Sequence, residues 1–240
     1  MKGMETTKKK DYVEIRYTGY ANGNIFDSNI EEDLKKIDEK AKPKEMIVII
    51  GEGMVASGFD KALENKEIEK EYEITLSAKE AFGERRKELI KTIPLKIFLE
   101  KKINPYPGMV VVMDNNLARI TAVSGARVIT DFNSPLAGKE IKYKFKILRK
   151  VSDDKEKSKA ALELLLRFAP EFEIKENETI VKGPKILEAY LSSVKDKFKE
   201  LAGKELKFEE KKEEKKEERQ EKKEEKDVKD TEKMPDKIGK

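Results

Sequence analysis

The sequence contains no cysteine and no histidine, and these two absences exclude several kinds of chemistry. Without cysteine the chain cannot form disulfides or use a thiolate, which fits a reducing, intracellular setting. Without histidine it lacks the commonest metal ligand and the usual general base near neutral pH. Gly51-Glu52-Gly53 is not followed by the rest of a dinucleotide fingerprint, and no phosphate-binding Gly-Lys-Ser/Thr occurs. We therefore expect no metal and no cofactor.

Long apolar runs and a strong excess of one charge are missing as well. The first residues, MKGMETTKKKDY, have no apolar core, and no apolar run approaches the length that spans a membrane. Lys and Arg number 53 against 49 Asp and Glu, a net charge of +4 that gives no strong attraction to nucleic acid or anionic membranes. We expect a cytoplasmic protein without membrane or nucleic-acid partners.

The chain is organised around residues 46–63, MIVIIGEGMVASGFDKAL. The short β-branched run at residues 46–50 predicts a buried strand, and Gly51 and Gly53 predict a turn. Ser57 is the expected N-cap of a helix that presents Phe59 on an apolar stripe. Apolar side chains therefore converge where the strand meets the helix, which is how an apolar cup is built.

Shorter patterns surround this stretch. Alternation predicts a strand at residues 13–17, and the glycines at 19 and 23 predict a turn after it. Ile30, Leu34, Ile37 and Ala41 recur at helical spacing, which predicts a helix over residues 30–41 outside the main sheet. Further strands are expected at residues 72–76 and 140–150.

Residues 84–133 interrupt this simple order. The expected elements there are a helix over residues 94–100 and strands over residues 109–113, 117–123 and 127–132. The most economical interpretation is a small α+β module inserted in a loop of a domain formed by residues 1–83 and 134–151.

A second folded unit is expected at residues 155–207, after a charged linker at residues 152–159. Its predicted elements are helices over residues 160–168 and 186–201, and a hairpin at residues 172–182. A unit this small tends to dock or dimerise, and the long apolar stripe of the second helix favours dimerisation or the clamping of a client. Residues 208–240 are dominated by Glu and Lys and predict a solvated, disordered tail.

Five short motifs occur in a meaningful order: Tyr17-Thr18-Gly19, Phe26-Asp27-Ser28, residues 48–51, residues 55–59 and Ala81-Phe82-Gly83. Singly each is weak, but as a set they resemble the FK506-binding-protein family of peptidyl-prolyl cis-trans isomerases. Residues 84–133, followed by Asn133-Ser134-Pro135-Leu136-Ala137-Gly138, resemble the SlyD-like branch, in which an insert-in-flap module replaces the tip of an active-site loop. The helix at 30–41 and the C-terminal extension look like the long archaeal members.

The resemblance implies an α+β fold: an FKBP-like antiparallel half-barrel sheet wrapped on a helix, an inserted small α+β domain and a small α+β C-terminal domain. The implied site is a proline pocket in which Tyr17, Asp27 and Phe59 are catalytic. The implied substrate-binding wall is Phe26, Met46, Val55, Ala56, Phe82 and Tyr143.

The sequence departs from the family pattern at several of these positions. Phe59 stands where the best-known relatives carry Trp, Met46 replaces an aromatic wall, and Ser134 replaces the usual His. Phe82 stands where the family usually has a Tyr whose hydroxyl binds a substrate carbonyl, so that contact should be missing.

The resemblance also implies that the inserted module binds unfolded or proline-containing polypeptides and presents them to the pocket. The expected chaperone surface is Ile93, Ile97, Phe98, Tyr106 and Met109, although about half of the module's apolar residues should form its own core. The alternative is a non-catalytic holdase or adaptor, which Phe82 and Met46 mildly favour.

Overall fold

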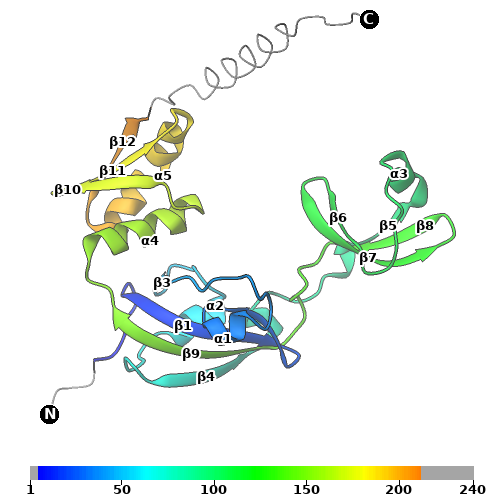
Figure 1. Ribbon diagram of the computed structural model, residues 1–240, viewed down its shortest axis with the longest axis horizontal. Helices are drawn as coiled ribbons and strands as arrows, with labels where there is room; N and C mark the ends of the chain where they lie inside the picture. The colour runs from blue at the N-terminus through cyan, green and yellow to red at the C-terminus, as the bar shows by residue number, and fades with distance from the viewer. Residues whose placement is uncertain (1–4, 212–240) are drawn as a thin grey trace, which may run out of the picture. The chain divides into compact units, whose positions relative to one another are not determined.

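The computed structural model describes residues 5–211, which divide between Asp153 and Asp154 into two compact units (Figure 1). The first unit contains two separate sheets with separate cores, and the second contains one sheet. The mixed α+β architecture with an antiparallel main sheet agrees with the expected fold class.

The main sheet has five strands, all paired antiparallel. They are β1 (Tyr12–Ala21), β2 (Asn24–Ser28), β3 (Met46–Ile49), β4 (Glu71–Leu76) and β9 (Ile141–Lys150). β1 lies between β2 and β9, its first half pairs with β3, and β4 pairs with the far side of β9. β1 is longer than expected because it continues through Gly19 to Ala21, and the turn lies at Asn22-Gly23.

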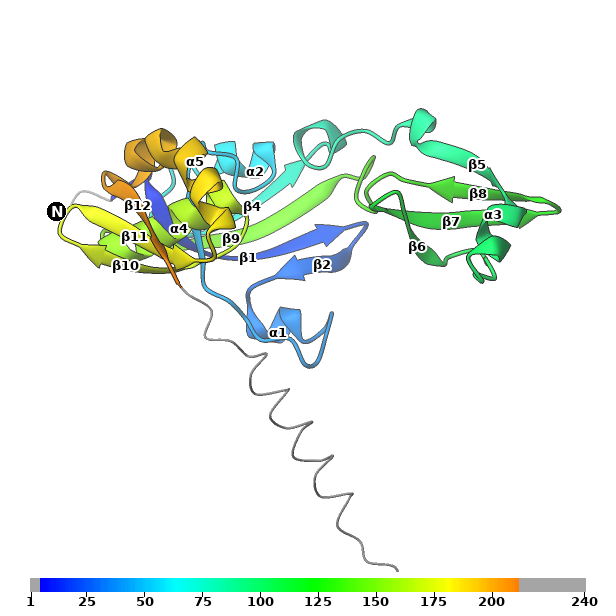
Figure 2. The ribbon, with the colours of Figure 1, turned by 90° about the horizontal axis from the view of Figure 1, so that it is seen from above.

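Two short helices accompany this sheet. α2 (Ser57–Ala62) lies against one face of the sheet, where Phe59 and Leu63 pack onto buried residues of β1, β3 and β9 (Figures 1 and 2). Its N-cap is Ala56 rather than the expected Ser57, whose hydroxyl instead donates to the Glu80 carbonyl at 3.0 Å. Single-turn 3-10 helices follow at Ala78–Glu80 and Lys87–Leu89.

The prediction of a helix over residues 30–41 is largely wrong. Only α1 (Glu31–Leu34) forms, and Ile37 is left exposed. No residue of α1 is buried, so the apolar positions of this segment have no core to pack on. Because packing on a core supplies most of a helix's stability, the longer helix does not form.

Residues 84–133 include a four-stranded sheet of their own, in the order β5-β8-β7-β6. Its elements are β5 (Ile90–Pro94), α3 (Leu95–Glu100), β6 (Val110–Met113), β7 (Asn116–Ser124) and β8 (Arg127–Asp131). β5 was not anticipated from the sequence, and it pairs with β8 through all five of its residues. The division of the first unit into two domains stays a prediction.

The second unit is a three-stranded sheet with two helices. Its elements are α4 (Asp154–Leu166), β10 (Glu171–Lys175), β11 (Glu178–Gly183), α5 (Ile186–Ala202) and β12 (Glu205–Glu210). α4 begins inside the segment expected to be linker, and α5 ends at Gly203, whose φ of 70° is the left-handed conformation of a helix C-cap.

β12 was also missed, and it extends the folded unit past the expected boundary at residue 207. It pairs parallel to β11, and Leu206 is buried although charged residues flank it. Two residues of the apolar stripe of α5, Leu191 and Phe198, are buried in the unit, whereas Ile186 and Tyr190 are exposed. The charged tail was expected at residues 208–240, and its part beyond Lys211 lies outside the described residues.

Candidate active site

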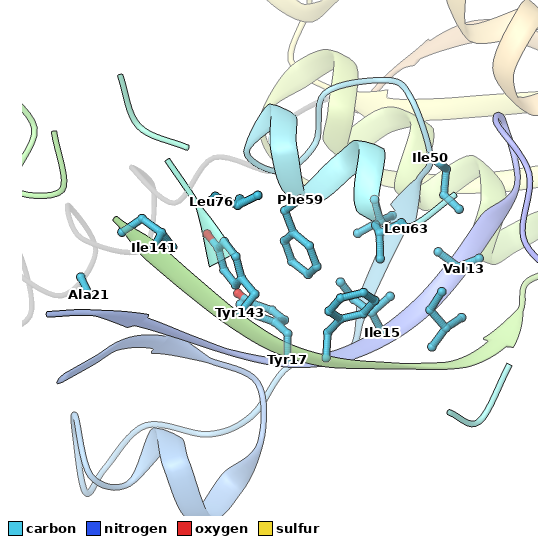
Figure 3. Packing of buried hydrophobic residues seen from close by; sticks show 13 residues of the cluster. Val13, Ile15, Tyr17, Ala21, Ile50, Phe59, Leu63, Leu76, Ile141 and Tyr143 are labelled. Carbon is cyan, nitrogen blue, oxygen red and sulfur yellow. The ribbon is translucent and has the colours of Figure 1, made fainter. Parts of the chain in front are cut away.

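The apolar cup is built on Phe59, which projects from the first turn of α2 toward the sheet (Figure 3). Its side chain is 1% exposed and stacks on Tyr143 of β9, with ring centroids 4.3 Å apart and planes inclined by 14°. Tyr17 of β1 and Phe145 of β9 contact the same ring, at centroid distances of 6.0 and 5.2 Å. Aromatic contacts from two strands therefore fix the orientation of Phe59.

A cavity of about 310 Å³ opens above this aromatic floor. Its lining includes all nine residues expected at the proline pocket: Tyr17, Phe26, Asp27, Met46, Val55, Ala56, Phe59, Phe82 and Tyr143. Gly53 and Met54 also line the cavity and were not expected from the sequence. Phe59 is thus buried beneath an open cavity and is not sealed in the core. The structure brings these residues together, and their roles stay predictions.

Gly19 makes room for one wall of the cavity. It pairs with Tyr143 across β1 and β9 and with Asp27 across β1 and β2. A Cβ atom at this position would lie 2.7 Å from the ring of Phe26, closer than real contacts allow. The absence of a side chain lets the Phe26 ring lie over the strand, where it meets Phe82 edge-on at 5.7 Å.

The polar part of the cup is a hydrogen bond at its rim. The hydroxyl of Tyr17 donates to Asp27 Oδ2 at 2.6 Å. Burial, and then the hydrogen bond to the Asp27 carboxylate, raises the pKa of Tyr17 well above its usual value. Tyr17 therefore keeps its proton and holds one oxygen of the carboxylate in place.

The opposite wall is the loop between β3 and α2, and Asp60 anchors it. Asp60 is 6% exposed, and its two carboxylate oxygens accept hydrogen bonds from the backbone N–H groups of Gly51 and Gly53, at 2.8 and 2.9 Å. The sulfur of Met54 accepts a further one from the Ile49 N–H at 3.2 Å. Asp60 escaped the sequence analysis because an acidic residue in a first helical turn usually serves the helix end.

Similar sequences among known proteins identify the family of this chain. A profile of the FKBP-type peptidyl-prolyl cis-trans isomerases matches residues 3–99, and one described as the FKBP26 IF domain matches residues 91–136. The short-type peptidyl-prolyl cis-trans isomerase of Methanocaldococcus jannaschii is 34% identical over 143 residues, which cover 58% of this chain and 91% of that protein. This chain belongs to the FKBP-type isomerases. It is a peptidyl-prolyl cis-trans isomerase.

Relatives named SlyD support the SlyD-like branch. The FKBP-type isomerase SlyD of Helicobacter pylori is 28% identical over 157 residues, covering 63% of this chain and 78% of the relative. SlyD of Escherichia coli is 26% identical over 124 residues, covering 49% of this chain and 61% of the relative.

The five residues expected at the chaperone surface of this isomerase differ in their exposure. Ile97 and Tyr106 are exposed, whereas Phe98 is 1% exposed and forms the centre of the insert's core. Ile93 and Met109 are partly buried against that core. Phe98 is therefore corrected to a core residue, because the face of α3 that carries it packs on β7 and β8 residues.

Other exposed apolar side chains of the insert were not anticipated. They are Leu99, Val110, Val112 and Leu117. Val112 and Leu117 pair across β6 and β7, so their side chains lie on one face of the hairpin. The sequence VVVM of β6 shows no alternation and has the composition of a fully buried strand, so it gave no signal of this exposed face.

Two absences concern residues 5–211 alone. No group of three or more Asp or Glu side chains there is arranged to hold a metal ion. No helix within the same range is both long and apolar enough to cross a membrane.

Proposed function

We propose that this isomerase assists protein folding by binding unfolded chains at its inserted module and isomerising their X–Pro bonds in the cup above Phe59. The single observation that carries the proposal is the open apolar cavity with a hydrogen-bonded carboxylate at its rim. The expected cytoplasmic location and the absence of nucleic-acid and membrane partners stay predictions. The non-catalytic alternative is set aside because the chain belongs to an enzyme family.

The cavity suits the chemistry of proline isomerisation. Rotation of an X–Pro bond crosses a barrier of about 20 kcal/mol that amide resonance creates. In the twisted transition state resonance is broken and the amide is less dipolar. A lining of Phe26, Val55 and Phe82 excludes the water that stabilises the planar dipole, so it favours the twisted state over the ground state.

Asp27 is the charged group of this lining. We infer that Tyr17 orients Asp27 and that the carboxylate interacts with the carbonyl carbon of the twisting amide. Tyr17→Phe and Asp27→Ala should each slow a proline-limited refolding reaction, because the carboxylate is then misplaced or absent. A macrolide that fills the cup should abolish the remaining acceleration.

Tyr72→Phe is the matched control for Tyr17→Phe. The Tyr72 hydroxyl accepts a hydrogen bond from the Glu67 N–H at 2.9 Å, and its ring stacks on Phe145 outside the cavity. This variant loses one tyrosine hydrogen bond without altering the cup. If Tyr17→Phe folds normally and is as active as Tyr72→Phe, the role assigned to Tyr17 is wrong.

The insert supplies an apolar surface for unfolded chains. Six side chains make up what we call the insert surface: Ile97, Leu99, Tyr106, Val110, Val112 and Leu117. Leu117 is 69% exposed and pairs with the exposed Val112, so adjoining apolar side chains face solvent, as they do in the apolar patches of interaction sites. Chains held here are presented to the cup at high effective concentration.

Two variants test this division of labour. Deleting residues 84–133 is geometrically feasible, because the Gly138 N–H donates to the Gly83 carbonyl at 2.8 Å and the ends of the insert are adjacent. The deletion should leave activity on short peptides intact and weaken catalysis on unfolded protein. The paired change Val112→Ser and Leu117→Ser in the full chain should do the same, with Arg119→Ser on β7 as a control that removes no apolar side chain. Equal loss on both substrates would contradict the proposal.

The second unit carries a smaller exposed apolar pair. Ile186 is 71% exposed and lies one helical turn before Tyr190, also exposed, on α5. We propose that a second copy of the chain, or else a client, covers this pair. Sedimentation equilibrium distinguishes the two: Ile186→Lys should lower the mass of a dimer, and a monomeric wild type leaves client clamping.

A further inference from the structure

One hydroxyl in the cup has no partner. Tyr143 is 5% exposed and lines the cavity from near the start of β9. The Tyr17 hydroxyl is committed to Asp27, but the Tyr143 hydroxyl makes no hydrogen bond with any of residues 5–211. A hydroxyl without a protein partner on a largely buried side chain requires an explanation, because polar groups in such places are normally hydrogen-bonded.

The hydroxyl is not sealed inside the core. A sealed, unpartnered oxygen does occur elsewhere, on Thr130, and the Tyr143 oxygen is not of that kind. Figure 3 shows the Tyr143 ring beside that of Phe59, with its oxygen at the end away from the strand. Because Tyr143 lines the cavity and its oxygen is not fully enclosed, the oxygen is accessible from the cavity.

The hydroxyl is available as a donor at physiological pH. Burial, and secondly the negative charge of Asp27, raises the pKa of Tyr143 to about 12. The aromatic neighbours Phe26 and Phe82 have no polar hydrogen to offer, and the only other hydroxyl of the cavity lining is that of Tyr17. An apolar cup whose one free side-chain donor is the Tyr143 hydroxyl fits a ligand with an acceptor and no donor at that point.

A proline-containing peptide has this chemistry. Proline has no N–H, and the carbonyls on either side of its ring are acceptors. We propose that the Tyr143 hydroxyl donates a hydrogen bond to the proline's own carbonyl in the bound substrate. This inference rests on the proposed use of the cavity as the substrate site.

The choice of carbonyl follows from the chemistry of the barrier. The carbonyl before the proline belongs to the rotating amide, and its oxygen is most negative in the planar state. A donor there would stabilise the ground state and slow rotation. The partial negative charge on the proline's own carbonyl oxygen does not change during the rotation. A hydrogen bond to this oxygen therefore stabilises the bound substrate and the transition state equally.

The test compares two substrates and two enzymes. The first substrate is a tetrapeptide containing Leu-Pro, and the second has the proline carbonyl oxygen replaced by sulfur, a poorer acceptor. Tyr143→Phe keeps the ring that stacks on Phe59. It should raise KM for the oxygen peptide about threefold to tenfold, the range of one hydrogen bond, with kcat little changed. The sulfur peptide should bind equally well to both enzymes.

Several outcomes would overturn the inference. An unchanged KM for Tyr143→Phe means that the hydroxyl does not touch substrate. An equal rise for both peptides means that the change acts through packing, and Tyr72→Phe gives the baseline for a hydroxyl lost outside the cup. Phe26→Ala tests whether the cavity is the substrate site. If Phe26→Ala alters KM and Tyr143→Phe does not, only this inference fails. If neither variant alters KM, the assignment of the cavity as the substrate site fails as well.

Discussion

The anchoring of the cavity wall by Asp60 gives the most demanding prediction. The wall residues Gly53, Met54 and Val55 lie in a loop that the Asp60 carboxylate fastens to α2 through the N–H groups of Gly51 and Gly53. Gly53 adopts a φ of 71°, so this turn conformation is one that glycine accepts without strain. Asp60→Asn keeps the shape of the side chain but replaces one acceptor oxygen with a donor.

The magnitude follows from the hydrogen bonds. A hydrogen bond to a charged group contributes about 1.5–3 kcal/mol, and the asparagine retains one acceptor. Gly51 and Gly53 are exposed, so water takes over part of the bond that the released N–H loses. We expect the free energy of unfolding to fall by about 2 kcal/mol. The loosened wall must also be ordered on binding, which should raise KM for a proline peptide roughly fivefold.

Thr7→Val is the matched control. The buried Thr7 hydroxyl donates to the Leu63 carbonyl at 2.5 Å and accepts from the Lys66 N–H at 3.0 Å. Both bonds hold the far end of α2, away from the cavity lining. Urea denaturation measures the stability of each variant, and peptide kinetics measure KM. If Asp60→Asn raises KM no more than Thr7→Val at a similar loss of stability, the anchoring argument is refuted.

Three further predictions concern pH, the insert core and the insert's attachment. Unfolded tyrosine ionises near pH 10 whereas folded Tyr143 has a pKa of about 12, so the folded state binds more protons in between. Stability should fall by about 2 kcal/mol from pH 10 to 12 on this account alone, measured by urea titration, and a flat profile would contradict the raised pKa. Phe98→Ala should cost about 3–5 kcal/mol in the insert core, with short-peptide activity spared; loss of that activity would mean that the two cores are coupled. Asn133 exchanges hydrogen bonds with the Arg86 N–H and carbonyl at 2.8 and 2.9 Å, so Asn133→Ala should speed amide hydrogen exchange at Arg86, and unchanged exchange would show that this contact protects nothing.

Local patterns in the sequence were sufficient where an element's own residues decide its structure. The alternation in β9 and the glycine turn at residues 51–53 predicted a strand and a turn that the structure contains. The nine cavity residues came from the order of the family motifs along the chain. The family profile itself ends at residue 99, yet the resemblance stated from the sequence also covered the return strand that carries Tyr143.

Local patterns failed where packing decides. The apolar spacing after Ile30 predicted a long helix, but no core covers it and only α1 forms. The segment ELKFEE resembles the charged residues that follow it, and it becomes β12 because β11 offers it a parallel edge. β5 likewise exists through its pairing with β8. An unpaired strand has no stable hydrogen bonds, so its partner, distant in sequence, determines whether it exists.

The sequence by itself determined the family, the two-residue and helical periods, and the set of residues that make the cup. The tertiary structure alone decided how those residues face one another. Pairing of β1 with β9 sets Gly19 opposite Tyr143, and the packing of α2 stacks Phe59 on the same ring. Side-chain type is a property of the chain, whereas an unpartnered hydroxyl or an anchored loop depends on contacts between distant segments. The committed Tyr17 hydroxyl, the free Tyr143 hydroxyl and the Asp60 anchor became visible only once the chain was folded.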